Sequence, residues 1–573
     1  MPEMTEFSTL LSHPVELIQS ISDELDIPDV CRLRLTCKEL TAHLGPQLFH
    51  TFTLDISRST IAKVIPRLEA LSRGDHVVCY SAKKLVIRSL SPSHNQDLYG
   101  TICSLTRTRP SNRLGQSESS EESYDVARAK EFMMAHLFDA IASLKNVRNV
   151  EWSPSSTDKA WSHQTVMNAL SSLPTLNRIS IRLSDVKIAL DLQFLKYLHE
   201  VNLDGVTLLR QGDIFESLAK AIAQNQCLTS ITLSRSWRQP FGGTLNQQNL
   251  HQLFKYYPAT APPLRLRHLS LRSFLVRLDS ITLHHLSHLT SLSLTCIEDP
   301  DVPVVATFPT GVQDDSLVHE RSKYGSTLDD IWKALINAGI HLVEITVDVV
   351  PSALLDYLAL YTGLKILRLM PGGFHGGGSS DTAADQFFSV ALKYHVQTLE
   401  DLQIASLFEG RWCFGSHNVD VISQCTKLRK LRMCINSDQL PSQQPHSIEE
   451  ANDMKLLLDT VVLHMPRISI VLIAGANQEA LRPSRSGYIS MVHFAAVNRK
   501  LSKIIDEYEP PPSCHRLPLL MVSSSGKLVY QCKTKQNIGT YSNNEAGLKE
   551  SRGLKYVKAP VFTSVNDTYS EWL

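Results

Sequence analysis

The sequence predicts an α/β protein in which a small N-terminal helical module precedes a curved solenoid, that is, a parallel sheet with outer helices. Two observations predict this fold class. Residues 13–50 carry apolar side chains at helical spacing in three short segments. From about residue 140 a strand-like motif recurs, and helical patterns precede several of its copies. A chain of 573 residues, 43% of them hydrophobic, has the length and composition for such an array.

The N-terminal module is predicted from spacing and helix-start signals. Pro14 suits the first turn of a helix, Glu16 places a carboxylate near its positive end, and Asp26 starts a second helix. Two apolar faces follow: Leu17, Ile18, Ile21 and Leu25 in the first helix, and Leu33, Cys37, Leu40 and Leu44 further on. So short a module rarely buries enough surface to be stable alone, and no metal or disulfide pattern accompanies it. We therefore expect its surplus apolar surface to bind a partner.

The repeated motif is L-x-x-L-x-L with conservative exchanges. Its copies start at residues 147, 176, 198, 228, 266, 289, 342, 364, 399, 428 and 465. Five of the ten gaps between successive starts lie within the period of about 20–29 residues that is typical of leucine-rich repeats. That repeat also expects Asn or Cys two residues beyond the last Leu, and only Asn436 fits. We expect an irregular leucine-rich-repeat solenoid; ordinary amphipathic strands of another α/β fold are the alternative.

Other segments complete the predicted order of elements. Strands are expected within 44–57 and 83–90, and insertions at 300–326 and 371–385. A helix at 490–509 and a hairpin at 517–532 follow the last copy and would cover the end of the solenoid. The predicted domains are the N-terminal module at 1–55, a connecting segment at 56–139 with a disordered loop near 107–124, the solenoid at 140–475, and a C-terminal cap of helix, hairpin and loose tail at 476–573.

Charge and composition exclude several classes of partner. Lys plus Arg equals Asp plus Glu, 57 each, so no global field attracts nucleic acid or anionic lipid. The first residues lack the cationic flank of a signal peptide, and the longest apolar run, at 468–476, is too short to span a bilayer. The eleven cysteines form no C-x-x-C pair. We expect a cytoplasmic or nuclear protein, or one found in both compartments, without a nucleic-acid or membrane partner.

The solenoid positions that alternate with the leucines should face outward along the concave side of the sheet. Basic and acidic side chains neighbour one another there, which favours simple cross-strand charge pairing, worth at most ~1 kcal/mol per pair. A mixed-charge face that binds a peptide substrate is the alternative. Its candidate contacts are Arg178, Arg182, Glu200, His268, Arg272, Glu344, Arg368, Lys430 and Arg432. Arg368, Lys430 and Arg432 would read a phosphate if they face a common groove.

Catalytic and metal-binding patterns are weak. The Gly-rich segment 372–380 lacks the Lys and Ser or Thr of a phosphate loop and is predicted to be a flexible insertion. His284 and His288 have helical zinc spacing but no third ligand, and Cys413 lies among aromatic residues, as a packing residue would. The sequence therefore predicts no catalytic residue, no metal and no cofactor. An enzyme on an unrecognised α/β fold would instead need a pocket of clustered ionisable groups.

Residues 13–50 resemble an F-box, whose pattern is Leu-Pro-x-Glu-Leu-Leu-x-x-Ile, Leu-Asp-x-x-Asp-Leu and Leu-Arg-x-Val-Cys-Lys-Arg-Trp. The matching segments here are "HPVELIQSI", "LDIPDV" and "CRLRLTCKEL", with departures at His13, Thr36, Glu39 and Leu40. The match covers less than a tenth of the chain. Together with the irregular repeats, it is similar to the fungal-type F-box proteins with leucine-rich repeats.

The resemblance implies a substrate-recognition subunit of a Skp–cullin–F-box ubiquitin ligase. The F-box would bind the Skp-family adaptor, and through it a cullin, while the repeats bind an unknown protein substrate. The residues implied at the adaptor interface, as contacts or as their support, are Pro14, Leu17, Ile18, Ile21, Leu25, Val30, Leu33 and Leu35. The alternative is a non-degradative scaffold with the same two modules for protein–protein interaction.

Overall fold

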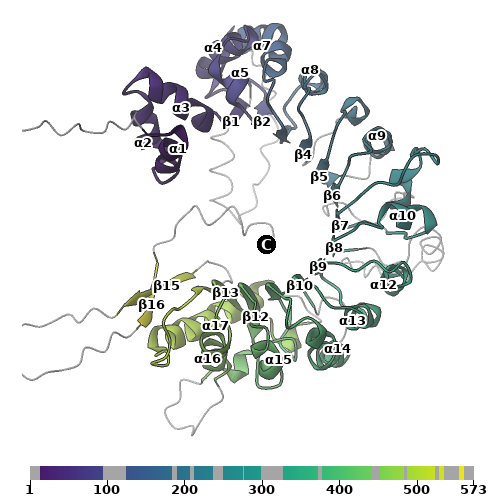
Figure 1. The fold of residues 1–573 in the computed structure, drawn as a ribbon, viewed down its shortest axis with the longest axis vertical. Helices are drawn as coiled ribbons and strands as arrows, with labels where there is room; N and C mark the ends of the chain where they lie inside the picture. The colour runs from purple at the N-terminus through teal and green to yellow at the C-terminus, as the bar shows by residue number, and fades with distance from the viewer. Residues whose placement is uncertain are drawn as a thin grey trace, which may run out of the picture. The chain divides into compact units, whose positions relative to one another are not determined.

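The computed structural model describes residues 13–93, 124–183, 190–206, 212–235, 250–274, 276–297, 327–371, 377–441, 452–482, 487–522, 528–534 and 554–559. By their packing the residues divide into two units. Unit 1 comprises Met1–His288 with Pro303–Tyr324, and unit 2 comprises Leu289–Val302 with Gly325–Leu573. The division falls inside the range 140–475 that the sequence assigns to the solenoid. The elements of both units are labelled in Figure 1.

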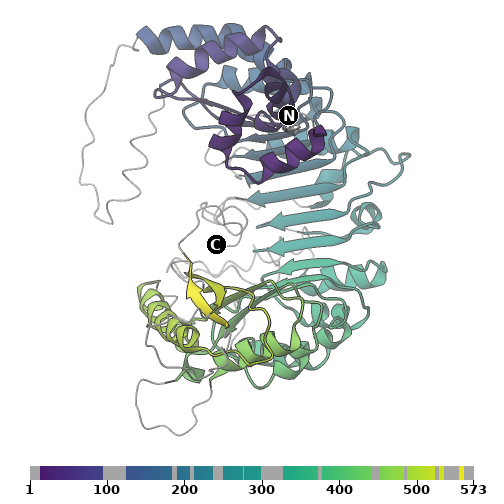
Figure 2. The ribbon, with the colours of Figure 1, turned by 60° about the vertical axis from the view of Figure 1, so that its left-hand side comes forward.

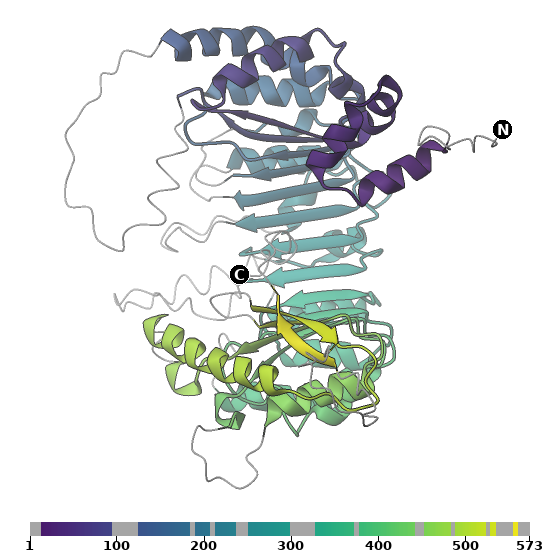
Figure 3. The ribbon, with the colours of Figure 1, turned by 90° about the vertical axis from the view of Figure 1, so that its left-hand side faces the viewer.

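Unit 1 begins with three short helices, α1 (Val15–Asp23), α2 (Ile27–Arg34) and α3 (Lys38–Leu48). They occupy the segment in which spacing predicts helices. In Figure 3 they form a dark purple group beside the first strands of the unit. α3 packs on both α1 and α2, and its other neighbour is α5 (Val77–Ser81). The module is therefore held together mainly through α3.

The rest of unit 1 is a parallel sheet whose strands follow one another in chain order. The strands are β1 (Thr51–Ile56), β2 (Lys84–Leu90), β3 (Asn149–Trp152), β4 (Arg178–Arg182), β5 (Glu200–Val206), β6 (Ser230–Arg235) and β7 (His268–Arg272). They run in one direction (Figure 2). This sheet starts at β1, whereas the sequence pattern predicts copies of the strand motif only from about residue 140.

Helices cover one face of this sheet in Figure 1. They are α4 (Ile61–Ser72), α7 (Tyr124–Ala142), α8 (Ala160–Ser171) and α9 (Gly212–Gln224), with short turns η2 (Leu192–Phe194) and η3 (Leu250–Phe254) and helix α10 (Ser280–His285) after them. The strand pattern explains the arrangement, because alternate residues such as Ile181 and Leu203 are fully buried against the helices. Their neighbours Ser180 and Asn202 lie half-buried on the other face.

Unit 2 repeats the same construction. Its parallel strands in chain order are β8 (Ser291–Thr295), β9 (Glu344–Val347), β10 (Ile366–Leu369), β11 (Asp401–Ile404), β12 (Lys430–Ile435), β13 (Ile470–Gly475) and β14 (Leu519–Val522). Between them lie α12 (Leu328–Asn337), α13 (Ser352–Ala359), α14 (Gly377–Ser389), η4 (Ala391–Tyr394), α15 (Val419–Ser423), η5 (Ser437–Gln439), α16 (Asp453–His464), η6 (Glu479–Leu481) and α17 (Gly487–Glu507). Helix followed by strand is thus the building block of both units, as the sequence predicts.

The C-terminal end of unit 2 matches the predicted helix and hairpin. α17 connects β13 to β14, and Gly475 allows the close approach, because a Cβ there would lie 2.8 Å from Val497 Cγ1. β14 then pairs antiparallel with β15 (Leu528–Thr534), and β15 with β16 (Leu554–Lys558). The change from parallel to antiparallel pairing ends the repeat pattern (Figure 3).

Two details differ from the sequence-based expectation, and two predicted segments are not described. The last motif copy is displaced, because Lys430 of β12 pairs with Ile470, so that the equivalent copy starts at Ile468 and not at Met465. Residues 377–380 of the Gly-rich segment begin helix α14 and do not form a flexible insertion. Residues 107–123 of the predicted loop, and 300–326 of the predicted insertion, lie outside the described residues.

Candidate protein-interaction surfaces

The α1–α3 module has a small apolar core of its own. Ile18, Val30, Leu40 and Leu44 are at most 5% exposed, and Leu33, Cys37 and Leu48 pack partly against them. Leu40 stands where the F-box pattern has Trp, and it occupies a core position. The core contains few large side chains, so little apolar surface stabilises these helices from within.

Polar side chains at the helix ends fix the three helices. Asp26 caps α2 by accepting a hydrogen bond from the Asp29 amide at 2.8 Å. Cys37 caps α3 in the same way, its Sγ accepting from the Leu40 amide at 3.4 Å, while Thr41 Oγ1 donates to the Arg34 carbonyl at 2.7 Å. These caps explain why short helices restart so closely after one another.

An apolar strip remains exposed on α1 and α2 despite this core. Leu17, Ile21 and Leu25 are 51%, 45% and 38% exposed and follow one another at helical spacing on α1 and its end. Ile27 and Leu35, at the start and the end of α2, are 73% and 79% exposed. We call these five residues the α1–α2 strip. Exposed apolar side chains that share one helical face, as Leu17, Ile21 and Leu25 do along α1, mark an interaction site more often than scattered ones do.

The structure separates the predicted adaptor-interface residues into two groups. Pro14, Leu17, Ile21, Leu25 and Leu35 are exposed, whereas Ile18 and Val30 are buried and Leu33 is half-buried in the module core. The second group can support an interface but is not exposed to a partner. Ile27 was missed, and helical spacing alone does not separate it from Val30, which lies three residues later on α2 and is buried. That any of these residues contacts a partner stays a prediction.

On the face of the unit 1 sheet opposite its helices, the predicted charged residues pair across strands. Arg178 lies 3.0 Å from Glu200, and Arg182 lies 3.6 Å from Asp204. Between these pairs, Asn202 Nδ2 donates to Ser180 Oγ at 3.1 Å. The other two candidates of this unit face small hydroxyl residues: His268 is in register with Ser230, and Arg272 with Ser234. This arrangement supports the interpretation as a cross-strand charge ladder.

The corresponding face of unit 2 has a different charge distribution. Arg368 Nη2 lies 2.9 Å from Asp401 Oδ2, and the register places Lys430 opposite Asp401. Arg432 is in register with Gln403, which in turn faces Arg368. Three of the nine predicted substrate contacts, Arg368, Lys430 and Arg432, thus lie within the adjacent strands β10, β11 and β12. Glu344 lies on β9, where it is in register with Ile366 of β10.

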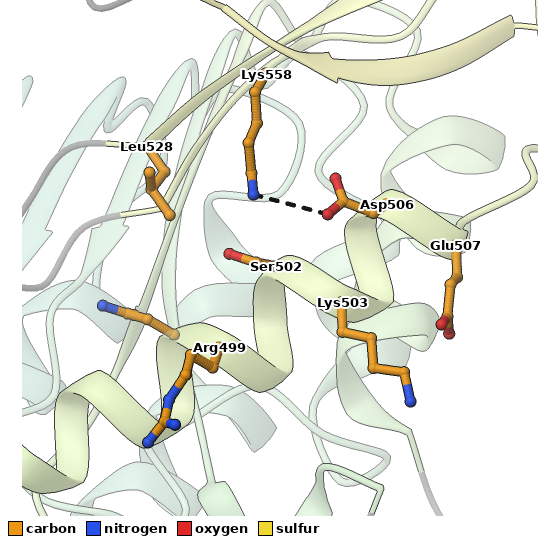
Figure 4. Close-up of a pocket in the computed structure, with 8 residues that line it drawn as sticks. Arg499, Ser502, Lys503, Asp506, Glu507, Leu528 and Lys558 are labelled. Atoms are coloured by element: carbon orange, nitrogen blue, oxygen red, sulfur yellow. Dashed lines mark ion pairs between the residues drawn. The ribbon is translucent and has the colours of Figure 1, made fainter.

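A shallow hollow of about 560 Å³ lies between α17 and the last strands, and sequence reasoning did not find it. Arg499, Ser502, Lys503 and Asp506 of α17 line it together with Lys558 of β16 (Figure 4). Lys558 Nζ lies 3.7 Å from Asp506 Oδ2, and both side chains are about half exposed. Charges of both signs alternate around the hollow, so it offers no uniform recognition surface.

The cysteines of unit 2 that lie near aromatic residues are packing residues. Burial raises the pKa of the Cys413 thiol well above its ordinary value, and raises that of Cys434 to about 11. A thiol that is held protonated is a poor nucleophile. Within the described ranges, no group of His, Cys, Asp or Glu side chains has a metal-binding arrangement. In the same part of the chain, no helix has the length and apolar character needed to cross a membrane.

Comparison of the sequence with protein families and with curated proteins gives no match. Among solved structures, the chain is similar to one described as the crystal structure of the Rad7 and Elc1 complex in yeast. The TM-score is 0.32 and the sequence identity 9%, over 82% of this chain and 94% of that chain. A TM-score this low does not assign the chain to a fold family.

Proposed function

We propose that this protein is the substrate-recognition subunit of a Skp–cullin–F-box ubiquitin ligase and has no catalytic residue of its own. The α1–α2 strip binds the Skp-family adaptor, and the two helix–strand units present a protein substrate. The observation that carries the proposal is the strip itself: Leu17, Ile21 and Leu25 stay exposed beside a module core that holds only a few buried side chains. The protein works in the cytoplasm, the nucleus or both.

The exposed strip has a physical consequence for stability and binding. Fully burying a Leu or Ile side chain contributes about 1.5–3 kcal/mol, so an apolar partner helix that covers the strip would stabilise both itself and the module. The strip lies on α1 and α2, whereas α3 faces the rest of unit 1 through α5. A partner can therefore cover the strip without displacing α3.

The direct test is binding of the purified full chain to a purified Skp-family adaptor. Wild type is expected to bind with submicromolar affinity, and Leu17→Asp and Ile21→Asp should each weaken binding by at least 100-fold, because a carboxylate buried in an apolar interface is costly. Met134→Asp is the matched control, since Met134 on α7 is 60% exposed and lies outside the strip. Wild type that is folded and does not bind, or equal losses in all three variants, would contradict adaptor binding.

A second measurement separates the ligase from a scaffold. If the full chain acts in a ligase, a cullin should be recovered with it from cells in amounts that fall with Ile21→Asp. Recovery of the adaptor without the cullin would favour the non-degradative scaffold.

A further inference from the structure

The segments that lead into the strands of unit 1 carry positive charge and no negative charge. Because these strands run in one direction, the segments lie along one edge of the sheet (Figure 2). They are residues 48–50, 81–83, 143–148, 171–177, 195–199, 224–229 and 264–267. They contain neither Asp nor Glu, and their Lys and Arg residues are Lys83, Lys145, Arg148, Lys196, Arg265 and Arg267. We call this edge the basic rim.

Backbone hydrogen bonds fix the spacing of these charges. One residue of each segment donates its amide to the carbonyl of the residue before it in a row, at 2.8–3.0 Å. The row is His50, Lys83, Arg148, Asn177, His199, Thr229 and Arg267. Neighbours in the row are about 5 Å apart at ordinary strand spacing, so Lys83 and Arg148 lie side by side. Like charges in directly opposite positions are destabilising, and an anion bound along the row would remove that cost.

The carboxylates nearest to the basic rim in the sequence are already engaged. Glu151 lies 2.6 Å from Lys84, and Glu200 lies 3.0 Å from Arg178. Within the described ranges, no ion pair involves the exposed cations Lys83, Lys145, Arg148, Lys196 and Arg265. A cation just after a helix end stabilises that helix, which accounts for Lys145 after α7 but not for Arg148 beside Lys83.

Exposed aromatic rings lie beside the same cations. Tyr197, next to Lys196, is 68% exposed, and Tyr80 is 58% exposed. The Tyr80 carbonyl accepts a hydrogen bond from Asn146 Nδ2 at 2.7 Å, so Tyr80 lies against the cationic segment 143–148. Rings this exposed add little to the core, and packing therefore does not explain their place at the rim.

A buried asparagine holds the segment of Tyr197 in place. Asn225 is 2% exposed, its Oδ1 accepts a hydrogen bond from the Leu198 amide at 2.7 Å, and its Nδ2 donates to the Leu195 carbonyl at 2.9 Å. These bonds fix the backbone on both sides of Lys196 and Tyr197, whose side chains stay exposed. A backbone that is already ordered reduces the entropy lost when a ligand binds there.

We propose that the basic rim binds single-stranded nucleic acid. The phosphates of the strand contact Lys83, Arg148 and Lys196, and its bases stack on Tyr80 and Tyr197. A row of cations with aromatic rings beside it suits such a strand, whereas the carboxylates of an acidic peptide have no use for the rings. The total charge predicts no nucleic-acid partner, but it does not register the segregation of charge at one edge. This binding goes beyond the proposed ligase function and does not depend on it.

The test uses the purified full chain and a fluorescent single strand of about 20 nucleotides and mixed sequence, as DNA and as RNA. Fluorescence anisotropy should show binding at about 50 mM salt that weakens about 20-fold at about 200 mM salt, as expected for three phosphate contacts. Lys83→Gln and Arg148→Gln should each weaken binding at least fivefold and flatten the salt dependence. Tyr197→Ala should weaken binding about fivefold or more and leave the salt dependence unchanged, because it removes a stacked base and no charge.

Arg88→Gln is the matched control, because Arg88 is exposed on β2 but lies away from the end of that strand at which Lys83 stands. No binding of either strand at about 50 mM salt, or an equal loss in Arg88→Gln and Arg148→Gln, would overturn the inference. Unchanged binding by Arg148→Gln together with a lower thermal midpoint would leave the rim a structural role only.

Two competitors test the class of ligand. Tighter binding of a duplex of equal length would overturn recognition of a single strand. Displacement of the labelled strand by a glutamate peptide of equal charge, at a lower concentration than by unlabelled strand, would assign the rim to an acidic protein segment instead. Leu17→Asp, which is expected to damage the α1–α2 strip, should bind the strand as wild type does, so the two proposals can fail separately.

Discussion

At the scale of single residues, His285 gives unit 1 a defined pH dependence. Its ring stacks on Phe254 at 4.5 Å between centroids, and its Nδ1 accepts a hydrogen bond from the Leu264 amide at 3.1 Å. Burial there, and secondarily the charge of His284, lowers the pKa of His285 to about 4. An unfolded histidine has a pKa of about 6.5. As pH falls below that value the unfolded state binds a proton that the folded state does not, so stability is lost between about pH 6.5 and 4.

We therefore expect His285→Gln to reduce the loss of unfolding free energy between pH 7 and pH 5, since a glutamine oxygen can still accept from Leu264 and does not titrate. Urea denaturation at both pH values measures this loss. His288→Gln is the control, because His288 is exposed on the following turn. His395 in unit 2 also has a pKa lowered to about 4 by burial, so part of the wild-type dependence should remain. A pH dependence unchanged by His285→Gln would show that His285 is not the titrating group.

At the scale of elements, the α1–α3 module depends on a small core of four buried apolar side chains. Leu44 is fully buried, and Leu44→Ala should cost about 2–5 kcal/mol, more than so small a core can lose. Hydrogen exchange should show loss of amide protection in α1–α3, while β3–β7 keep theirs, and adaptor binding should disappear. Leu35→Ala, at a 79% exposed position, should weaken adaptor binding without loss of protection. If both variants keep full protection, the packing of the module does not depend on Leu44.

The sequence predicts the strands of the sheet better than it predicts the candidate site. Ten of the eleven motif copies are followed by a strand that begins two residues after the motif start. The eleventh is displaced because "MPRISIVLI" contains two overlapping matches, and only pairing with β12 selects between them. β1 and β2 begin at the same offset from Phe49 and Ala82, where the first Leu of the motif is replaced. Pairing with neighbours, not the motif alone, decides which strands join the sheet.

Within the candidate site, neighbouring residues of one apolar pattern have opposite roles. Leu17 and Ile18 are adjacent, yet the first is half exposed and the second is fully buried against the module core. The difference depends on where α3 packs, which helical spacing in α1 does not encode. The sequence predicts Arg368, Lys430 and Arg432 as one set of candidate contacts, and only the structure shows that Asp401 already pairs with Arg368. Long-range packing is the information that the linear pattern lacks.

At the scale of the whole chain, both units are built from parallel neighbours, so each strand depends on the next one for its hydrogen bonds and for its core. Such an array needs a covered end, because an uncovered edge strand exposes unpaired backbone groups and apolar side chains. In unit 2, β15 and β16 provide this cover through antiparallel pairing with β14, and Tyr530 on β15 is completely buried. α17 also packs on β16, which ties the last helix to the same cover.

Removing this cover should therefore damage unit 2 selectively. A chain that ends after Val522 loses β15 and β16, exposes the edge of β14 and removes the contact between α17 and β16. We expect hydrogen exchange to show loss of protection in β13, β14 and α17, decreasing towards β9, and light scattering to show association through the open edge. Amides of β1–β7 should keep their protection, because stability in repeat arrays comes from nearest neighbours. A full chain with Lys555→Gln, which keeps β16 and changes only one of its charges, is the control. Equal loss of protection in β1–β7 and in β13–β14 would show that the chain unfolds as one cooperative block and that the C-terminal strands stabilise all of it.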